Sequence, residues 1–140
     1  MSALQWDRQS LTAAQRRINE LRRRITAAEE KALGAAGSAL LDDAKNISPT
    51  IPKASAPLGG TLRDSGRLHI GDKYVDLVFD SPYAAVMHAG RWATGPLAGV
   101  SVTRWSEPGS GPFWLSEKLR RFGEKYVKLM SKTIQDEVGM

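Results

Sequence analysis

Residues 11–46 read LTAAQRRINELRRRITAAEEKALGAAGSALLDDAKN, and this stretch decides the fold of the chain. Apolar side chains recur in it at spacings of three and four residues, a heptad pattern that predicts a helix with its arginines off the apolar seam. The seam consists of Leu11, Ala14, Ile18, Leu21, Ile25, Ala28 and Ala32. Ser10 is the expected N-cap. Helical spacing continues through Gly34 and Gly37, although each costs the helix about 1 kcal/mol relative to Ala. Two prolines after Asn46 end the predicted helix.

The next stretch, residues 47–60, is rich in proline, glycine and small polar residues. Each X-Pro pair disfavours a helix, and each proline lacks the N–H group that a strand would use. We therefore predict a proline-rich loop or extended arm, and we expect it to become ordered against a neighbouring subunit.

A β-hairpin and one further strand are predicted in the middle of the chain. Leu68 and Ile70 flank His69 before a tight turn at Gly71 and Asp72, and after the turn every second residue is apolar at Val75, Leu77 and Phe79. A third strand is predicted at Val100, Val102 and Trp105. A sheet this small leaves strand edges and one face uncovered, so we expect it to pair with another chain.

Two more helices complete the predicted elements. Ser81 is a cap and Pro82 suits the first helical position, which predicts a short helix over residues 83–89 that stops at Gly90. The last helix, over residues 112–138, is predicted to be amphipathic. Its apolar positions are Phe113, Leu115, Leu119, Phe122, Tyr126, Leu129 and Ile134, widened by Trp114, Val127 and Met130.

This order of elements predicts an α+β fold with a long N-terminal helix, a small antiparallel sheet interrupted by a short helix, and a long C-terminal helix. At 140 residues the chain suits one domain, residues 1–140. Its predicted parts are a helical region (1–46), the proline-rich loop (47–60), the sheet with its short helix (61–111) and the last helix (112–138).

Composition excludes several kinds of chemistry. The chain has no cysteine, so it can form neither a disulfide, nor a thiolate zinc site, nor a thiol nucleophile. No apolar run is long enough to span a bilayer, and the start of the chain lacks the apolar core of a signal peptide. We therefore expect a protein without membrane contact that stays in the cytoplasm where it is made, or in a particle assembled there.

No catalytic or metal-binding arrangement is evident. The chain has two histidines, His69 and His88, and neither has a second ligand at the spacing of a zinc-binding helix. Asp80, Ser81 and His88 contain the residue types of a hydrolytic triad, but a role as a helix cap explains Ser81 sufficiently. We predict no enzyme activity, no cofactor and no metal.

Positive charge is concentrated at the two ends of a chain whose net charge is +5. Residues 7–24 hold six arginines against two acidic residues, and we expect Glu20 to pair with Arg24. Clustered arginines can neutralise phosphates, so a nucleic-acid-binding protein is one alternative. Against it, no aromatic residues for base stacking are interleaved with these arginines, and no nucleic-acid-binding motif occurs.

Two of the four tryptophans, Trp92 and Trp105, lie in segments flanked by glycine and proline. Tryptophan is concentrated in protein cores and at interfaces. A docking surface explains both residues, and core packing is the competing explanation.

Three short motifs occur in an order that resembles the tail-completion, or head–tail joining, minor proteins of long-tailed bacteriophages. The motifs consist of Leu62, Arg63 and Ser65; of Pro82, Tyr83, Ala84, His88 and Gly90; and of Pro112 with Phe113. The resemblance covers residues 61–119.

The resemblance implies a structural role without catalysis. It implies a ring of identical subunits, six by expectation, in the virion at the junction of tail and capsid neck. The partners would be other copies of the chain and the adjoining neck and tail proteins, with DNA passing through the assembly but not specifically bound. The proline-rich loop and residues 91–110 would be arms that contact neighbours.

Residue roles follow from this picture. Tyr83 and His88 would fix the short helix against the sheet, and Phe113 would anchor the last helix in the core. At the subunit interface, Arg63 and Arg67 would pair with acidic residues of a neighbour, and Trp92 and Trp105 would fill its pockets.

Alternative functions remain. One is the neighbouring tail-terminator or stopper ring, and another is a small basic nucleic-acid-binding protein. A third is an enzyme with a pocket formed by His88 and either Asp80 or Asp76.

Overall fold

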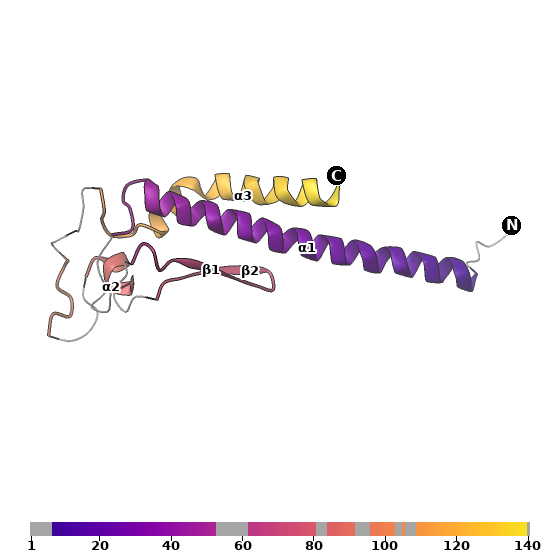
Figure 1. The fold of residues 1–140 in the computed structure, drawn as a ribbon, viewed down its shortest axis with the longest axis horizontal. Coiled ribbons are helices and arrows are strands. Elements are labelled where there is room, and N and C mark those ends of the chain that lie inside the picture. Colours follow the sequence, from indigo (N-terminus) through magenta and orange to yellow (C-terminus); the bar gives the residue numbers. More distant parts are fainter. Residues whose placement is uncertain are drawn as a thin grey trace.

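A computed structural model describes residues 7–52, 62–80, 84–91, 96–102, 105 and 109–139. Its elements in chain order are α1 (Arg8–Asn46), β1 (Arg67–Gly71), β2 (Tyr74–Val78), α2 (Ala84–Ala89) and α3 (Ser116–Val138). The predicted α+β class is confirmed. The helix α3 and the hairpin of β1 and β2 both lie along α1, and α2 lies near the end of α1 that is remote from the N-terminus (Figure 1).

α1 is one helix of 39 residues, as the heptad pattern predicts. Its N-cap is Asp7 and not Ser10: the Oδ1 atom of Asp7 accepts a hydrogen bond from the backbone N–H of Ser10 at 2.7 Å. Ser10 therefore lies inside the first turn and supplies one of the free N–H groups that an N-cap satisfies. At the other end, the N–H of Ile47 donates to the carbonyl of Asp43 at 2.9 Å and closes the last turn.

The two glycines of α1 allow the hairpin to pack closely on the helix. A Cβ atom at Gly37 would lie 3.0 Å from a methyl of Leu68 and 3.1 Å from a methyl of Val75. A Cβ atom at Gly34 would lie 3.1 Å from Ile70. Because glycine has no side chain, the hairpin can pack directly on the helix at these two positions. This packing offsets the helix propensity that the two glycines lose.

The sheet has two antiparallel strands in the described residues, with Leu68 opposite Leu77 in the register. Their two-residue turn is Asp72-Lys73, one position later than expected, and Lys73 adopts the left-handed conformation with φ 61°. The two-residue hairpin is confirmed.

The predicted third strand is wrong for the part of 100–105 that is described. Ser101 forms only an isolated antiparallel bridge with Arg91. The N–H of Val100 closes a turn onto the carbonyl of Leu97 at 2.9 Å, and Gly99 within that turn has φ +81°. This turn ends at Val100, the first residue of the predicted strand, and the described residues after it form no ladder beyond the single bridge at Ser101.

The last helix begins at Ser116 and not near Pro112, because Phe113 has φ 59° and cannot continue a right-handed helix. The expected anchoring role of Phe113 is also wrong. Phe113 is 51% exposed, whereas the neighbouring Trp114 is 2% exposed. Trp114 packs in the main core with Leu41, Ala44, Ile51 and Leu62, and a second cluster joins Ala36, Leu40 and Tyr126.

The beginning of the proline-rich segment belongs to the core of its own chain. Ile51 and Pro52 are buried, and the N–H of Thr50 donates to the carbonyl of Gly109 at 2.9 Å. The expectation of an arm ordered by a neighbour is therefore wrong for residues 47–52, because Ile51 fills a place beside Trp114. Residues 53–60 lie outside the described residues.

Candidate functional site

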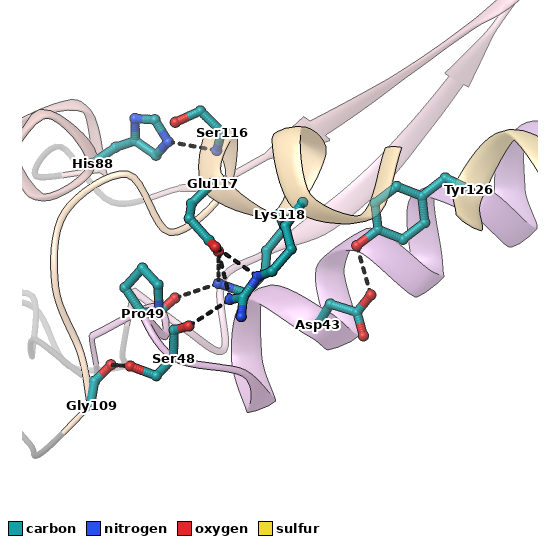
Figure 2. Close-up of polar contacts among 10 residues, drawn as sticks. Asp43, Ser48, Pro49, His88, Gly109, Ser116, Glu117, Lys118 and Tyr126 are labelled. Carbon is teal, nitrogen blue, oxygen red and sulfur yellow. Dashed lines mark hydrogen bonds and ion pairs between the residues drawn. The ribbon is translucent and has the colours of Figure 1, made fainter. Parts of the chain in front are cut away.

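A cluster of charged side chains lies where α3 begins and where the chain leaves α1 (Figure 2). The Nζ atom of Lys118 donates to the carbonyl oxygen of Pro49 and to Oε2 of Glu117, each at 2.8 Å. Arg121, one turn later, donates to the carbonyl oxygen of Ser48 at 2.8 Å and to Glu117 at 2.9 Å. Two cations of α3 therefore hold the backbone that follows α1.

Arg63 adds a third cation from the segment before β1. Its Nε and Nη2 atoms donate to the carbonyl oxygen of Ile51 at 2.9 and 2.6 Å. We call Arg63, Lys118 and Arg121, with the carbonyl groups they bind, the carbonyl clamp. These carbonyl groups follow the C-terminus of α1, where cations are favourable for the helix dipole. The structure thus gives Arg63 a role within its own chain.

The carboxylates beside the clamp are held in their charged form. The hydrogen bond from Lys118, followed by that from Arg121, lowers the pKa of Glu117 below its ordinary value. Partial burial disfavours the ionised form of Asp43, but hydrogen bonds from Lys125 and Tyr126 outweigh it and lower the pKa of Asp43. Burial, and then the bond to Asp43, raise the pKa of the Tyr126 phenol. These groups keep their usual protonation states at neutral pH, which suits a static network and not proton transfer.

His88 joins α2 to the beginning of α3. Its Nε2 atom accepts a hydrogen bond from the N–H of Ser116 at 3.3 Å, and its ring lies edge-on to Trp114 with 4.9 Å between centroids. Burial lowers the pKa of His88. His88 therefore fixes the short helix to the start of α3, where we had expected the sheet, and Tyr83 lies outside the described residues.

The described contacts do not assemble the triad weighed above. Asp80 forms an ion pair with Arg67, and Asp76 lies opposite His69 in the hairpin register. His88 uses its described hydrogen bond on a backbone N–H group. Ser81 lies outside the described residues.

Several motif residues meet around the main core. Leu62 is fully buried, the hydroxyl of Ser65 donates to its carbonyl at 2.8 Å, and Ala84 packs against the same core cluster. Gly90 has φ +71°, and a Cβ atom there would lie 2.8 Å from Pro112. Of the expected interface residues, Arg67 is exposed and paired with Asp80, and Trp105 is partly buried. Pro82 and Trp92 lie outside the described residues.

An apolar groove of about 490 Å³ runs between α1, β2 and α3. Ala36 and Leu40 line it from α1, Val75 from β2, and Leu119, Gly123 and Val127 from α3. Leu119 and Val127 are 50% and 56% exposed. The sequence pattern failed to predict this groove because it placed Leu119 on the inner face of α3. In the structure Lys118 is buried and Leu119 is half exposed. The one available signal was Gly123, a glycine in the middle of a helical pattern.

Neither a metal site nor a membrane span is found in the described part of the chain. No group of three or more His, Asp or Glu side chains there could hold a metal ion. No described helix combines the length and the apolar character needed to cross a bilayer.

Comparison of the chain with protein-family models, with curated proteins and with solved structures gives no match.

Proposed function

We propose that this chain is a structural subunit of a homo-oligomeric ring, with six copies expected, at the head–tail junction of a long-tailed bacteriophage. The ring completes the tail and joins it to the neck, and it catalyses no reaction. The observation that carries the proposal is the open apolar groove beside a sheet of two strands. The order of the three sequence motifs supports the phage assignment.

The groove has the character of an interface. It exposes Leu119 and Val127, which lie two turns apart on one face of α3, and Asp76 is the one charged residue among the described residues that line it. Gly123 lies in the groove, and apart from the adjoining residues and backbone of α3 itself no described atom comes within 4 Å of a Cβ atom placed there. A glycine within a helix costs about 1 kcal/mol relative to Ala. Because no described contact requires that glycine, the free space suits the close approach of another chain.

The hairpin offers a second, different surface. Each of the two strands has one edge that pairs with no strand among the described residues, and such edges are sites for pairing with another chain. A ring needs heterologous contacts, in which one surface of a subunit meets a different surface of the next. The groove and the hairpin edge are two such surfaces on one chain.

The carbonyl clamp suits a structural subunit better than an enzyme. Its cations are bound to backbone carbonyls, and His88 is bound to a backbone N–H. These bonds engage the polar atoms of Lys118, Arg121 and His88 with the backbone, which fixes the geometry of the chain.

One observation favours nucleic-acid binding as a second candidate function. Arg16, Arg17, Arg22 and Arg23 are exposed, and none has an ion-pair partner among the described residues. Electrophoretic retardation of duplex DNA at two salt concentrations separates the two functions. Tight binding that weakens steeply with salt would support the second candidate. A ring through which DNA slides is expected to show little retardation.

The ring proposal is tested by sedimentation velocity over a concentration series, with electron microscopy of the assembled species. We expect rings of the wild-type chain at high concentration. Val127→Glu places a charge in the groove and should leave only monomer, whereas Lys132→Glu, at an exposed position of the same helix, should still assemble. A wild-type chain that stays monomeric at every concentration, or a Val127→Glu variant that still forms rings, would contradict the proposal.

A further inference from the structure

The first part of α1 projects beyond the rest of the molecule (Figure 1). α3 runs antiparallel to α1 and ends where the carbonyl of Val138 accepts a hydrogen bond from Nη2 of Arg24 at 3.3 Å. Residues 8–23 lie beyond that point, and we call them the N-terminal arm. They span roughly 24 Å at 1.5 Å per residue. The arm is a capped helix, because Asp7 satisfies the N–H of Ser10 at its far end.

The apolar seam of the N-terminal arm is uncovered by the described residues of the chain. Leu11, Ile18 and Leu21 are 54%, 47% and 47% exposed. With Leu11 at heptad position a, Ile18 is also at a and Leu21 is at d. A stripe restricted to positions a and d is the narrow seam of a coiled coil, whereas a helix that lies on a membrane has a broad apolar face. The seam therefore favours one partner helix.

Arginines flank this seam on both sides. Arg17 is at position g and Arg22 at position e, and neither has an ion-pair partner in the described structure. Arg24, also at position g, donates to a carbonyl group and not to Glu20 as expected. Positions e and g contact the partner helix in a coiled coil and determine which partner is accepted.

These charges disfavour a second copy of the arm as the partner. In a parallel pair, Arg17 at g of one copy would face Arg22 at e of the other. In an antiparallel pair, the arginines at position g would face one another. Both arrangements place like charges together, while a helix with Glu or Asp at its flanking positions would neutralise them. Nucleic acid would use the arginines and leave the seam exposed.

We propose that the N-terminal arm binds an acidic amphipathic helix of a different protein. The partner's apolar seam packs on Leu11, Ile18 and Leu21, and its carboxylates pair with Arg17 and Arg22. This proposal does not depend on the ring, because the arm lies outside the groove.

The test uses the full chain and two labelled synthetic peptides of three heptads. Both peptides carry Ile at position a and Leu at position d; one has Glu and the other has Lys at positions e and g. Fluorescence anisotropy should show that the Glu peptide binds at least tenfold more tightly than the Lys peptide. Absence of binding, or equal binding of the two peptides, would overturn the proposal.

Variants separate a specific seam from general charge attraction. Arg17→Glu with Arg22→Glu should reverse the preference, so that the Lys peptide binds more tightly. Arg16→Glu with Arg23→Glu makes the same change in net charge at position f, away from the seam, and should keep the original preference. Ile18→Ser with Leu21→Ser should weaken Glu-peptide binding at least tenfold while thermal unfolding stays unchanged. Equal effects of the two arginine pairs, or no effect of the two serines, would overturn the proposal.

Two further probes test the other occupants. If the wild-type chain associates with itself and the Ile18→Ser, Leu21→Ser variant does not, a second copy covers the seam and the proposal is wrong. If duplex DNA binds the wild-type chain more tightly than the Glu peptide does, and binds the serine variant equally well, the arginines serve nucleic-acid binding and the proposal is wrong. Assembly of rings is a separate measurement and should be unchanged by the serine pair, so failure of either proposal is recognised independently.

Discussion

The ammonium group of Lys118 donates a hydrogen bond to the carbonyl oxygen of Pro49, with 2.8 Å between Nζ and O, and the lysine side chain is completely buried. Glu117, the second acceptor of that ammonium, retains 18% exposure of its side chain. The contact ties the beginning of α3 to the segment that leaves α1, two parts of the chain that are 69 residues apart. A buried cation bound in this way stabilises the fold only while its acceptors remain in place.

Lys118→Met should therefore destabilise the chain strongly. Methionine fills much of the volume of the lysine stem, but it leaves the Pro49 carbonyl without this donor and Glu117 with Arg121 alone. We expect a loss of about 3 kcal/mol in the free energy of unfolding, measured by urea denaturation. Lys125→Met is the control, because Lys125 also bonds a carboxylate at 2.8 Å but is 53% exposed. The free energy of unfolding of Lys125→Met should fall by less than about 1 kcal/mol. Equal decreases in the two variants would contradict a special role for Lys118.

The glycines of the two long helices should respond to alanine in opposite ways. Gly123→Ala adds a methyl group in open space and should raise the free energy of unfolding of the monomer by about 1 kcal/mol. Gly37→Ala forces Leu68 and Val75 to move, so strain should outweigh the gain in helix propensity and lower stability by about 1 kcal/mol. Thermal and urea unfolding of both variants measure this difference.

The same Gly123→Ala variant distinguishes the chain's own stability from its assembly. If the groove receives a neighbour, the added methyl group should shift ring formation to higher concentration in sedimentation velocity while the monomer becomes more stable. Unchanged assembly would show that the space above Gly123 has no part in the subunit interface.

His88 should make stability depend on pH. Burial lowers its pKa in the folded state below the ordinary value of 6.5, so the unfolded chain binds the proton first as the pH falls. The contribution of His88 is thus complete above pH 6.5 and is lost as the pH decreases through the folded-state pKa. His88→Gln should flatten the pH dependence of the unfolding free energy between neutral and mildly acidic pH. His69→Gln removes the exposed histidine of β1 and should preserve that dependence.

The long helix, the hairpin and the short helix could be predicted because local sequence determines each of them. α1 follows from a heptad pattern that ends before prolines, and α2 ends at Gly90, whose positive φ few other residues adopt. The two-residue turn follows from alternation on both sides of it. In each of these elements the side-chain pattern and the backbone requirement agree.

The groove and the clamp depend on contacts between distant segments, and local patterns do not reveal them. Lysine at position 118 is expected at the surface, and only the carbonyl of Pro49 makes its burial favourable. Phe113 and Trp114 are equally suited to the core by residue type, and the left-handed backbone at Phe113 decides between them. The seam of α1 was predicted correctly as a pattern, but whether the chain itself covers it depends on where α3 ends.

The N-terminal arm should lose helix when its cap is removed. Asp7→Ala deletes the carboxylate that accepts from the N–H of Ser10 at 2.7 Å, and that hydrogen bond also lowers the pKa of Asp7. Since no described part of the chain packs on the arm, fraying there is opposed only by local interactions. Amide hydrogen exchange over residues 10–16 should become several-fold faster in Asp7→Ala, while exchange in the buried part of α1 stays unchanged. Ser10→Ala keeps the backbone donor and should have the smaller effect; a larger effect would mean that Ser10 caps the helix after all.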